Sequence, residues 1–128
     1  GTYVAWVASS DSNDPESSSR FAPLRSAGAM KLVDGATVAS GWSDLVDGDL
    51  SVDISQTENG GSEDDRVWTG VSQFGHWRGT GRDCNGWTTT ATVDGYIGRS
   101  ISTNFIWTKW TNWGCGNSER LYCFQNSK

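Results

Sequence analysis

The sequence predicts a mixed α+β domain in which short strands dominate and long irregular loops connect them. Two apolar runs, residues 3–7 and 121–124, have the length and composition of buried strands. Between them, sixteen glycines and many Ser, Thr, Asn and Asp residues favour turns over long helices. Eight tryptophans, four phenylalanines and three tyrosines supply enough apolar surface for one core. We therefore expect a single domain over residues 1–128.

The first half of the chain should contain one helix and one hairpin after its opening strand. The run at residues 3–7 is apolar at every position, which predicts a strand buried on both faces. Asp14 followed by Pro15 is typical of a helix start, so a short helix should reach about Phe21. Residues 31–38 hold two small apolar runs around Asp34-Gly35, the dipeptide of a tight hairpin turn.

The middle of the chain alternates between short elements and polar loops. Residues 40–45 should form one helical turn, while Val52 and Ile54 alternate with polar neighbours as in a half-buried strand. Residues 56–66 are predicted to form a solvated acidic loop.

The second half begins with a strand and then loses any regular pattern. We expect a strand at residues 67–70 and a glycine-rich loop at residues 71–83. Residues 88–104 are rich in Gly, Thr and Ser, and are predicted to form a long loop before the closing strand at residues 121–124.

Charge and hydropathy exclude two classes of partner. Ten basic residues against fifteen acidic ones give a net charge of −5, which argues against nucleic acid or another polyanion. No run approaches the ~18 apolar residues that a membrane span requires. The chain also lacks an Asn-x-Ser/Thr glycosylation site, which disfavours a heavily glycosylated ectodomain.

The three cysteines, Cys84, Cys115 and Cys123, lie among tryptophans and predict a disulfide framework. Disulfides persist in oxidising compartments, so we expect a secreted protein or one on the cell surface. The odd count leaves one cysteine without a partner inside the chain. Loop-closure entropy does not distinguish the alternative pairings.

Three tryptophans near the end of the chain allow two interpretations. Trp107, Trp110 and Trp113 could be core rings under a loop, or exposed rings that bind a ligand together with Asn112. Indole rings beside an amide side chain can stack on sugars or anchor a protein partner. We expect one or two of the three rings to be exposed.

The acidic residues of the chain suggest a calcium-binding site as a further possibility. A set with the ligand spacing of a helix-loop-helix site is Asp47, Asp49, Ser51, Asp53, Ser55 and Glu58. Its sixth position is Val52, where the sharp turn requires glycine, so we interpret the segment as a solvated loop and strand. A looser set of oxygen ligands for Ca²⁺ would draw on Glu58, Glu63, Asp64, Asp65 or Asp83. The sequence assigns no definite metal site.

Catalysis has little support in the sequence. His76 is the only imidazole, and no nucleophile, zinc or phosphate-loop motif accompanies it. A single histidine in a glycine-rich loop is usually solvated. We expect no enzyme activity.

The whole pattern resembles one known family. The resembling stretches are residues 1–9, Leu32-Val-Asp-Gly with Trp42-Ser-Asp-Leu45, Val67-Trp-Thr-Gly70, Cys84-Asn-Gly-Trp87, and Cys115 through residues 121–125. They are similar to the endostatin domain of certain collagens, and more closely to bacterial secreted and surface proteins of unknown function with the same C-type-lectin-like fold. The resemblance implies that fold for this chain.

The resemblance also implies a set of bonds. It pairs Cys84 with Cys115 and joins Cys123 to a cysteine on a helix that precedes the first strand. Residues 1–128 do not include that helix, so we expect Cys123 to bond to a separate N-terminal segment or to a segment of a partner chain, with a buried free thiol as the competing possibility. Where sugar-binding C-type lectins carry Trp-Asn-Asp to help hold Ca²⁺, this chain has Trp110-Thr111-Asn112, with one carboxylate fewer.

These observations together predict an extracellular binding module. Its expected partner is a glycan or a cell-surface protein, recognised through the long loop region that includes Trp107, Trp110, Asn112 and Trp113. The alternative is a structural subunit that assembles with copies of itself, or with another chain, in an extracellular appendage.

Overall fold

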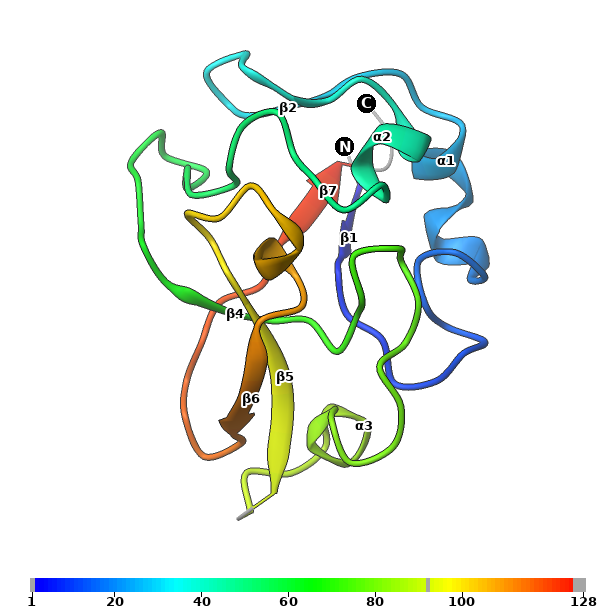
Figure 1. The fold of residues 1–128 in the computed structure, drawn as a ribbon, viewed down its shortest axis with the longest axis vertical. Helices are drawn as coiled ribbons and strands as arrows, with labels where there is room; N and C mark the ends of the chain where they lie inside the picture. Colours follow the sequence, from blue (N-terminus) through cyan, green and yellow to red (C-terminus); the bar gives the residue numbers. More distant parts are fainter. Residues whose placement is uncertain (1, 92, 126–128) are drawn as a thin grey trace.

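The structure is a computed structural model, and it describes residues 2–91 and 93–125. Its elements are all short (Figure 1) and in chain order are β1 (Tyr3–Ala5), η1 (Ser19–Phe21), α1 (Ala22–Arg25), β2 (Met30–Lys31), β3 (Thr37–Ala39), α2 (Trp42–Leu45), β4 (Arg66–Trp68), α3 (Cys84–Trp87), β5 (Asp94–Arg99), η2 (Phe105–Trp107), β6 (Thr111–Gly114) and β7 (Cys123–Gln125). Predictions that include Gly1 or Thr92 extend beyond the described residues at those positions.

The strands form three small sheets, in the orders β1-β7, β2-β3 and β4-β5-β6. Every pairing of these strands is antiparallel. The prediction of a strand-dominated α+β domain is therefore confirmed at the level of fold class. Figure 1 shows β1 and β7 side by side near the two ends of the chain, with the β4-β5-β6 sheet beyond them.

The first and last strands pair with each other, with Tyr3 opposite Gln125 and Ala5 opposite Cys123. Strands at both ends were expected, but burial of β1 on both faces was wrong. Val4 is buried, whereas 66% of Tyr3 is exposed. A two-stranded ribbon has one face on the core, and the side chains alternate between its two faces.

The first helix begins later than Asp14, which corrects the predicted start. The Asp14 side chain is almost fully buried and accepts hydrogen bonds from the backbone N–H groups of Ser17 (2.9 Å) and Trp77 (3.0 Å). It therefore links two loops, and the chain makes a turn here. Ser18 accepts from the N–H of Arg20 instead and begins η1, which leads into α1.

In the next segment the hairpin and the helical turn are confirmed, and one strand is not found. Gly35 takes a left-handed conformation (φ 92°) in the turn between β2 and β3, and α2 lies within residues 40–45. Val52 and Ile54 do not form a strand. The Asp53 carboxylate accepts from the N–H and hydroxyl of Ser55, and this local turn replaces ladder pairing.

The loop predicted at residues 88–104 was wrong, because β5 within it is the central strand of the β4-β5-β6 sheet. Its glycines serve close packing rather than turns. A Cβ on Gly98 would lie 1.9 Å from the backbone oxygen of Trp107, and one on Gly95 would lie 2.7 Å from the Cys84 sulfur. Only glycine lets these groups approach the strand, and the same glycines weaken its strand signal.

The core is centred on the fully buried rings of Trp6 and Trp107, whose centroids lie 5.2 Å apart. The Trp6 indole N–H donates to the Thr108 hydroxyl (2.8 Å), which donates to the Val71 carbonyl (2.9 Å). The Tyr122 hydroxyl donates to the Trp107 carbonyl (2.7 Å). These bonds satisfy buried polar groups and join β1, η2 and the segment before β7.

Candidate functional site

The four predicted site residues do not lie together. Trp107 is fully buried in the core, while Trp110 and Trp113 are half-buried at the surface. On β6, Asn112 pairs with Tyr96 and Trp113 pairs with Gly95. Because successive side chains alternate between the faces of a strand, Asn112 and Trp113 point to opposite faces of the sheet.

An arginine side chain covers each of the two accessible tryptophans. The guanidinium carbon of Arg66 lies 4.0 Å from the Trp113 ring centroid, and that of Arg99 lies 5.6 Å from the Trp110 centroid. Arg66 on β4 is directly opposite Arg99 on β5, so the ladder register places these pairs side by side. Both distances fall within the range of cation–π attraction.

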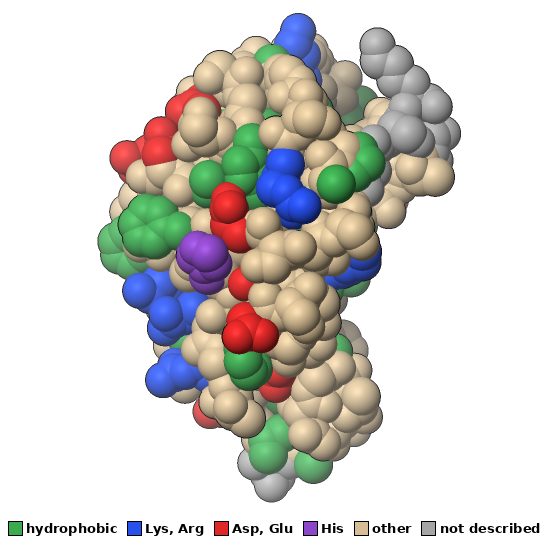
Figure 2. Space-filling model, turned by 90° about the vertical axis from the view of Figure 1, so that its right-hand side faces the viewer, with side chains coloured by type: hydrophobic (Ala, Val, Ile, Leu, Met, Phe, Trp, Pro, Cys, Tyr) green, Lys and Arg blue, Asp and Glu red, His purple; other side chains and the backbone are tan. Residues whose placement is uncertain are grey.

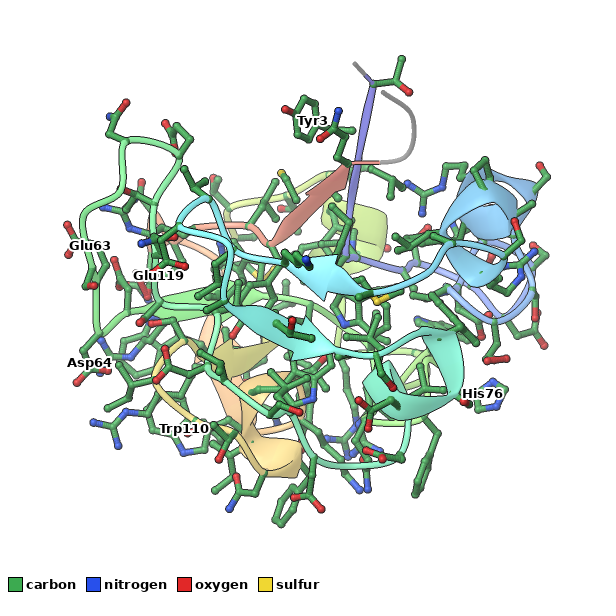
Figure 3. The ribbon with its side chains drawn as sticks, turned by 90° about the horizontal axis from the view of Figure 1, so that it is seen from above. Tyr3, Glu63, Asp64, His76, Trp110 and Glu119 are labelled. Carbon is green, nitrogen blue, oxygen red and sulfur yellow. A yellow bond between two sulfur atoms is a disulfide. The ribbon has the colours of Figure 1, made fainter. Side chains whose placement is uncertain are left out.

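Acidic side chains surround this group. The set comprising Arg66, Arg99, Trp110, Trp113, Glu63, Asp64, Asp65, Glu119 and Arg120 is called the Trp–Arg face below. Figure 3 shows Glu63, Asp64, Trp110 and Glu119 along one side of the molecule, with His76 far from them. Most of these residues belong to β4, the loop before it, and the segment after β6.

Two of the arginines are held in ion pairs. Arg99 donates through Nε and Nη2 to the two oxygens of Asp64, at 3.2 and 3.0 Å. This paired contact lowers the pKa of the Asp64 carboxyl. Arg120 donates through Nε to Asp65 at 2.8 Å and lies 3.7 Å from Glu63. The pairs fix the orientation of the arginines, although exposed pairs of this kind add little stability.

Glu119 is the carboxyl group whose ionisation is disfavoured. Its partial burial and the nearby Asp65 carboxylate raise its pKa, while the Arg66 charge opposes the shift. Burial is the larger of the two causes, so the raised pKa reflects mainly the partial removal of Glu119 from water.

A small hollow opens within the Trp–Arg face, with a volume of about 140 Å³. It is lined by Asp64, Asp65, Arg66, Arg99 and Trp110. Carboxylates accept and guanidinium groups donate hydrogen bonds, and an indole ring offers a flat apolar surface. Such a hollow can take a ligand that has many hydroxyl groups and one apolar face.

Sequence reasoning missed the arginines and placed these carboxylates only in a calcium set. The arginines are far apart in the chain, at positions 66, 99 and 120. Their proximity depends on strand register, which no local spacing reveals. No sequence signal marked them, because Arg66 lay outside the predicted strand and Arg99 lay within a predicted loop.

The cysteines follow the implied pairing. Cys84 and Cys115 form a disulfide with Cα atoms 5.7 Å apart. Cys123 is a free cysteine, and the residue as a whole is exposed. Its thiol group is partly buried, and this burial together with the nearby Glu58 raises the pKa of the thiol. Its predicted bond to another segment stays a prediction.

Backbone strain accompanies the disulfide. Within α3, Cys84, Asn85, Gly86 and Trp87 all have positive φ, at 50°, 54°, 71° and 64°. The turn is therefore left-handed, which costs an L-residue roughly 1–2 kcal/mol. The Asp83 carboxylate accepts from the Gly86 N–H, and the Trp87 indole donates to the Ala8 carbonyl (3.0 Å). These contacts and the disulfide hold the turn in place.

Of the residues considered for calcium, Glu63, Asp64 and Asp65 belong to the Trp–Arg face and pair with arginines there. No group of three or more His, Cys, Asp or Glu side chains placed to hold a metal occurs within the described residues. Asp47 accepts from the N–H of Asp49. His76 is largely exposed, with Nδ1 3.7 Å from the buried Asp14 carboxylate. Calcium binding stays a prediction.

Two further findings bear on the class of protein. In the part of the chain that the structure describes, no helix has the length and apolarity that crossing a membrane requires. Neither a comparison with protein-family models nor a search of curated proteins found a match to the chain. Function must therefore be argued from the Trp–Arg face itself.

Proposed function

We propose that the protein is a non-catalytic extracellular module that binds a glycan through the Trp–Arg face. The observation that carries this proposal is the hollow beside the half-buried Trp110, bounded by Asp64 and Arg99 in fixed orientations. A sugar ring can stack its apolar face on an indole while carboxylate and guanidinium groups bond its hydroxyls. Sites of this kind use a few oriented polar groups for specificity.

A C-type-lectin-like fold of the bacterial endostatin-like type forms part of the proposal. The Cys84–Cys115 disulfide supports it, because the resemblance implied this pairing. The antiparallel pairing of the first and last strands is consistent with it. The disulfide also favours an oxidising compartment, and hence secretion or display on a cell surface.

A glycan array read with wild-type protein and two variants tests the proposed function. Trp110→Ala should lose the array signal, because it removes the stacking surface while the ion pairs remain. Val33→Ala is a matched control, since Val33 is exposed in the β2-β3 hairpin, distant from the face in the sequence. An array without hits for wild-type protein, or equal hits for Trp110→Ala, would contradict the proposal.

The alternative is a structural subunit that assembles with its own copies, and one observation favours it. Tyr3 (66% exposed) and the free Cys123 lie on the outward face of the β1-β7 ribbon, and Leu121 (50% exposed) is two residues before β7. Exposed apolar residues on one strand pair can mark an assembly surface. Sedimentation should then show a dimer or larger species that Tyr3→Ser combined with Leu121→Ser dissociates, and a monomer at all concentrations would exclude this alternative.

A further inference from the structure

Two arginines converge on one tyrosine ring on the face of the sheet opposite Trp113. The Tyr96 ring on β5 is almost fully buried. The guanidinium carbon of Arg78 lies 4.6 Å from the centroid of this ring, and that of Arg82 lies 5.6 Å from it. Asn112 on β6 is paired with Tyr96, and its side-chain oxygen lies 3.4 Å from Nη1 of Arg82.

Unlike Arg99 and Arg120 of the Trp–Arg face, these two arginines have no carboxylate partner among the described residues. Among the described residues the ion pairs of arginine involve Arg99 and Arg120, not Arg78 or Arg82. The Nε atom of Arg78 is buried and has no hydrogen-bond acceptor. A buried donor without an acceptor is uncommon in folded proteins, and it is costly unless a ligand completes it.

The charge arrangement is also unusual for this chain. Two positive groups within reach of one ring repel each other, although the protein as a whole carries a net charge of −5. Figure 2 shows Lys and Arg side chains gathered on one side of the single histidine, and acidic side chains on its other side. An anionic group between the two guanidiniums would turn mutual repulsion into attraction for both.

We propose that Arg78, Arg82 and Asn112 bind the carboxylate of an acidic sugar. Guanidinium groups match a carboxylate through paired hydrogen bonds. The net negative charge of the chain disfavours a polyanion, which leaves a ligand with a single charge. The Asn112 amide beside Arg82 can bond a hydroxyl next to that carboxylate, as a uronic acid presents. The site is on the other face of the sheet and does not depend on the Trp–Arg face.

The test is a titration with glucuronate in which NMR monitors the arginine Nε–H signals and the Tyr96 ring signals. A parallel titration with glucose uses a neutral ligand of similar shape as the control. Glucuronate should shift both sets of signals and bind at least about tenfold more tightly than glucose. Arg78→Gln and Arg82→Gln should each weaken glucuronate binding by about tenfold or more. Lys31→Gln removes the same charge at an exposed hairpin position and should change nothing.

A variant that spares the stacked arginines guards against misfolding. Asn112 is exposed, so Asn112→Ala should fold normally and weaken glucuronate binding several-fold. Equal binding of glucose and glucuronate, or unchanged binding in both arginine variants, would overturn the proposal. An acidic peptide that displaces glucuronate and binds more tightly would overturn the assignment to a sugar. Loss of the Trp110 site by Trp110→Ala should leave glucuronate binding intact, which separates this proposal from the first.

Discussion

Trp107 and Trp113 are six positions apart in one segment, yet the protein uses them in opposite ways. Trp107 lies under β5, where the backbone at Gly98 approaches it and Tyr122 bonds its carbonyl. Trp113 lies on the other side of the same sheet, where the Arg66 guanidinium covers it. Sequence spacing alone therefore does not separate a core ring from a surface ring. The groups that cover each tryptophan ring determine whether it belongs to the core or to the surface.

The core and the Trp–Arg face should also respond differently to amino-acid substitution. The core region is close-packed around buried rings, so a substitution there costs stability. The Trp–Arg face is held by exposed ion pairs that contribute roughly 0–1 kcal/mol each, so a substitution there should cost binding instead. Substitutions in the two regions should therefore differ in their effect on stability.

The largest effect is expected from Gly98→Ala. Its Cβ would lie 1.9 Å from the Trp107 oxygen and 2.6 Å from the Trp107 carbonyl carbon, so β5 and η2 must separate. We expect a loss of more than about 4 kcal/mol in the free energy of unfolding, measured by urea denaturation. Gly28→Ala is the control, because nothing lies within 4 Å of its Cβ. Equal stability of the two variants would contradict the packing described for β5.

Removing the ring of Trp107 should have the next largest effect. Trp107→Ala opens a cavity in the core and should reduce the free energy of unfolding by about 3–5 kcal/mol. Trp110→Ala, on the Trp–Arg face, should reduce it by less than about 1 kcal/mol. Thermal denaturation of both variants measures the contrast. Similar losses would mean that Trp110 belongs to the core and is unavailable to a ligand.

Glu119 sharpens the comparison through pH. Since its folded-state pKa is raised above the usual 4.5, its ionisation opposes folding as the pH rises through the raised value. Glu119→Gln keeps a group of the same shape without the charge. The variant should therefore have a higher melting temperature than the wild type at pH 7, and the difference should disappear near pH 4. A lower melting temperature of the variant at pH 7 would show that the ionised carboxylate stabilises the face.

The smallest effect concerns the thiol of Cys123. Burial and then the charge of Glu58 raise its pKa above the usual 9.0, which reduces the thiolate fraction at neutral pH. Glu58→Gln should speed alkylation of Cys123 at pH 8, by less than about threefold because exposed charges are screened. Mass spectrometry of timed samples measures the rate, and Glu119→Gln serves as a control for the loss of one negative charge elsewhere. A slower reaction in Glu58→Gln would contradict this assignment of cause.

The sequence was sufficient for the elements whose signals are local. The strands at both ends, the Asp34-Gly35 hairpin and the helical turn at Trp42 follow from apolar runs and turn residues, and all are found. The Cys84–Cys115 bond came from the family resemblance and is also found.

Elements that depend on distant contacts escaped prediction. Gly95 and Gly98 gave β5 the composition of a loop. Their actual role is to make room for residues 84 and 107, which are distant in the sequence, so no local pattern reveals it. Asp14 has the local signature of a helix cap, yet its carboxylate binds the backbone of Trp77. Of the Trp–Arg face, the sequence analysis named Trp110 and Trp113 but not the arginines that cover them, and ligand binding at these residues stays a prediction.

The pairing of Tyr3 with Gln125 determines how the domain would respond to a pulling force. Force applied through both ends acts on neighbouring positions of an antiparallel pair, so it would peel β1 from β7 one hydrogen bond at a time. The Cys84–Cys115 bond stops the extension of everything between those residues, and β5 and η2 lie within that span. A tethered molecule under tension would therefore open early at its ends and retain a covalently closed segment containing Trp110.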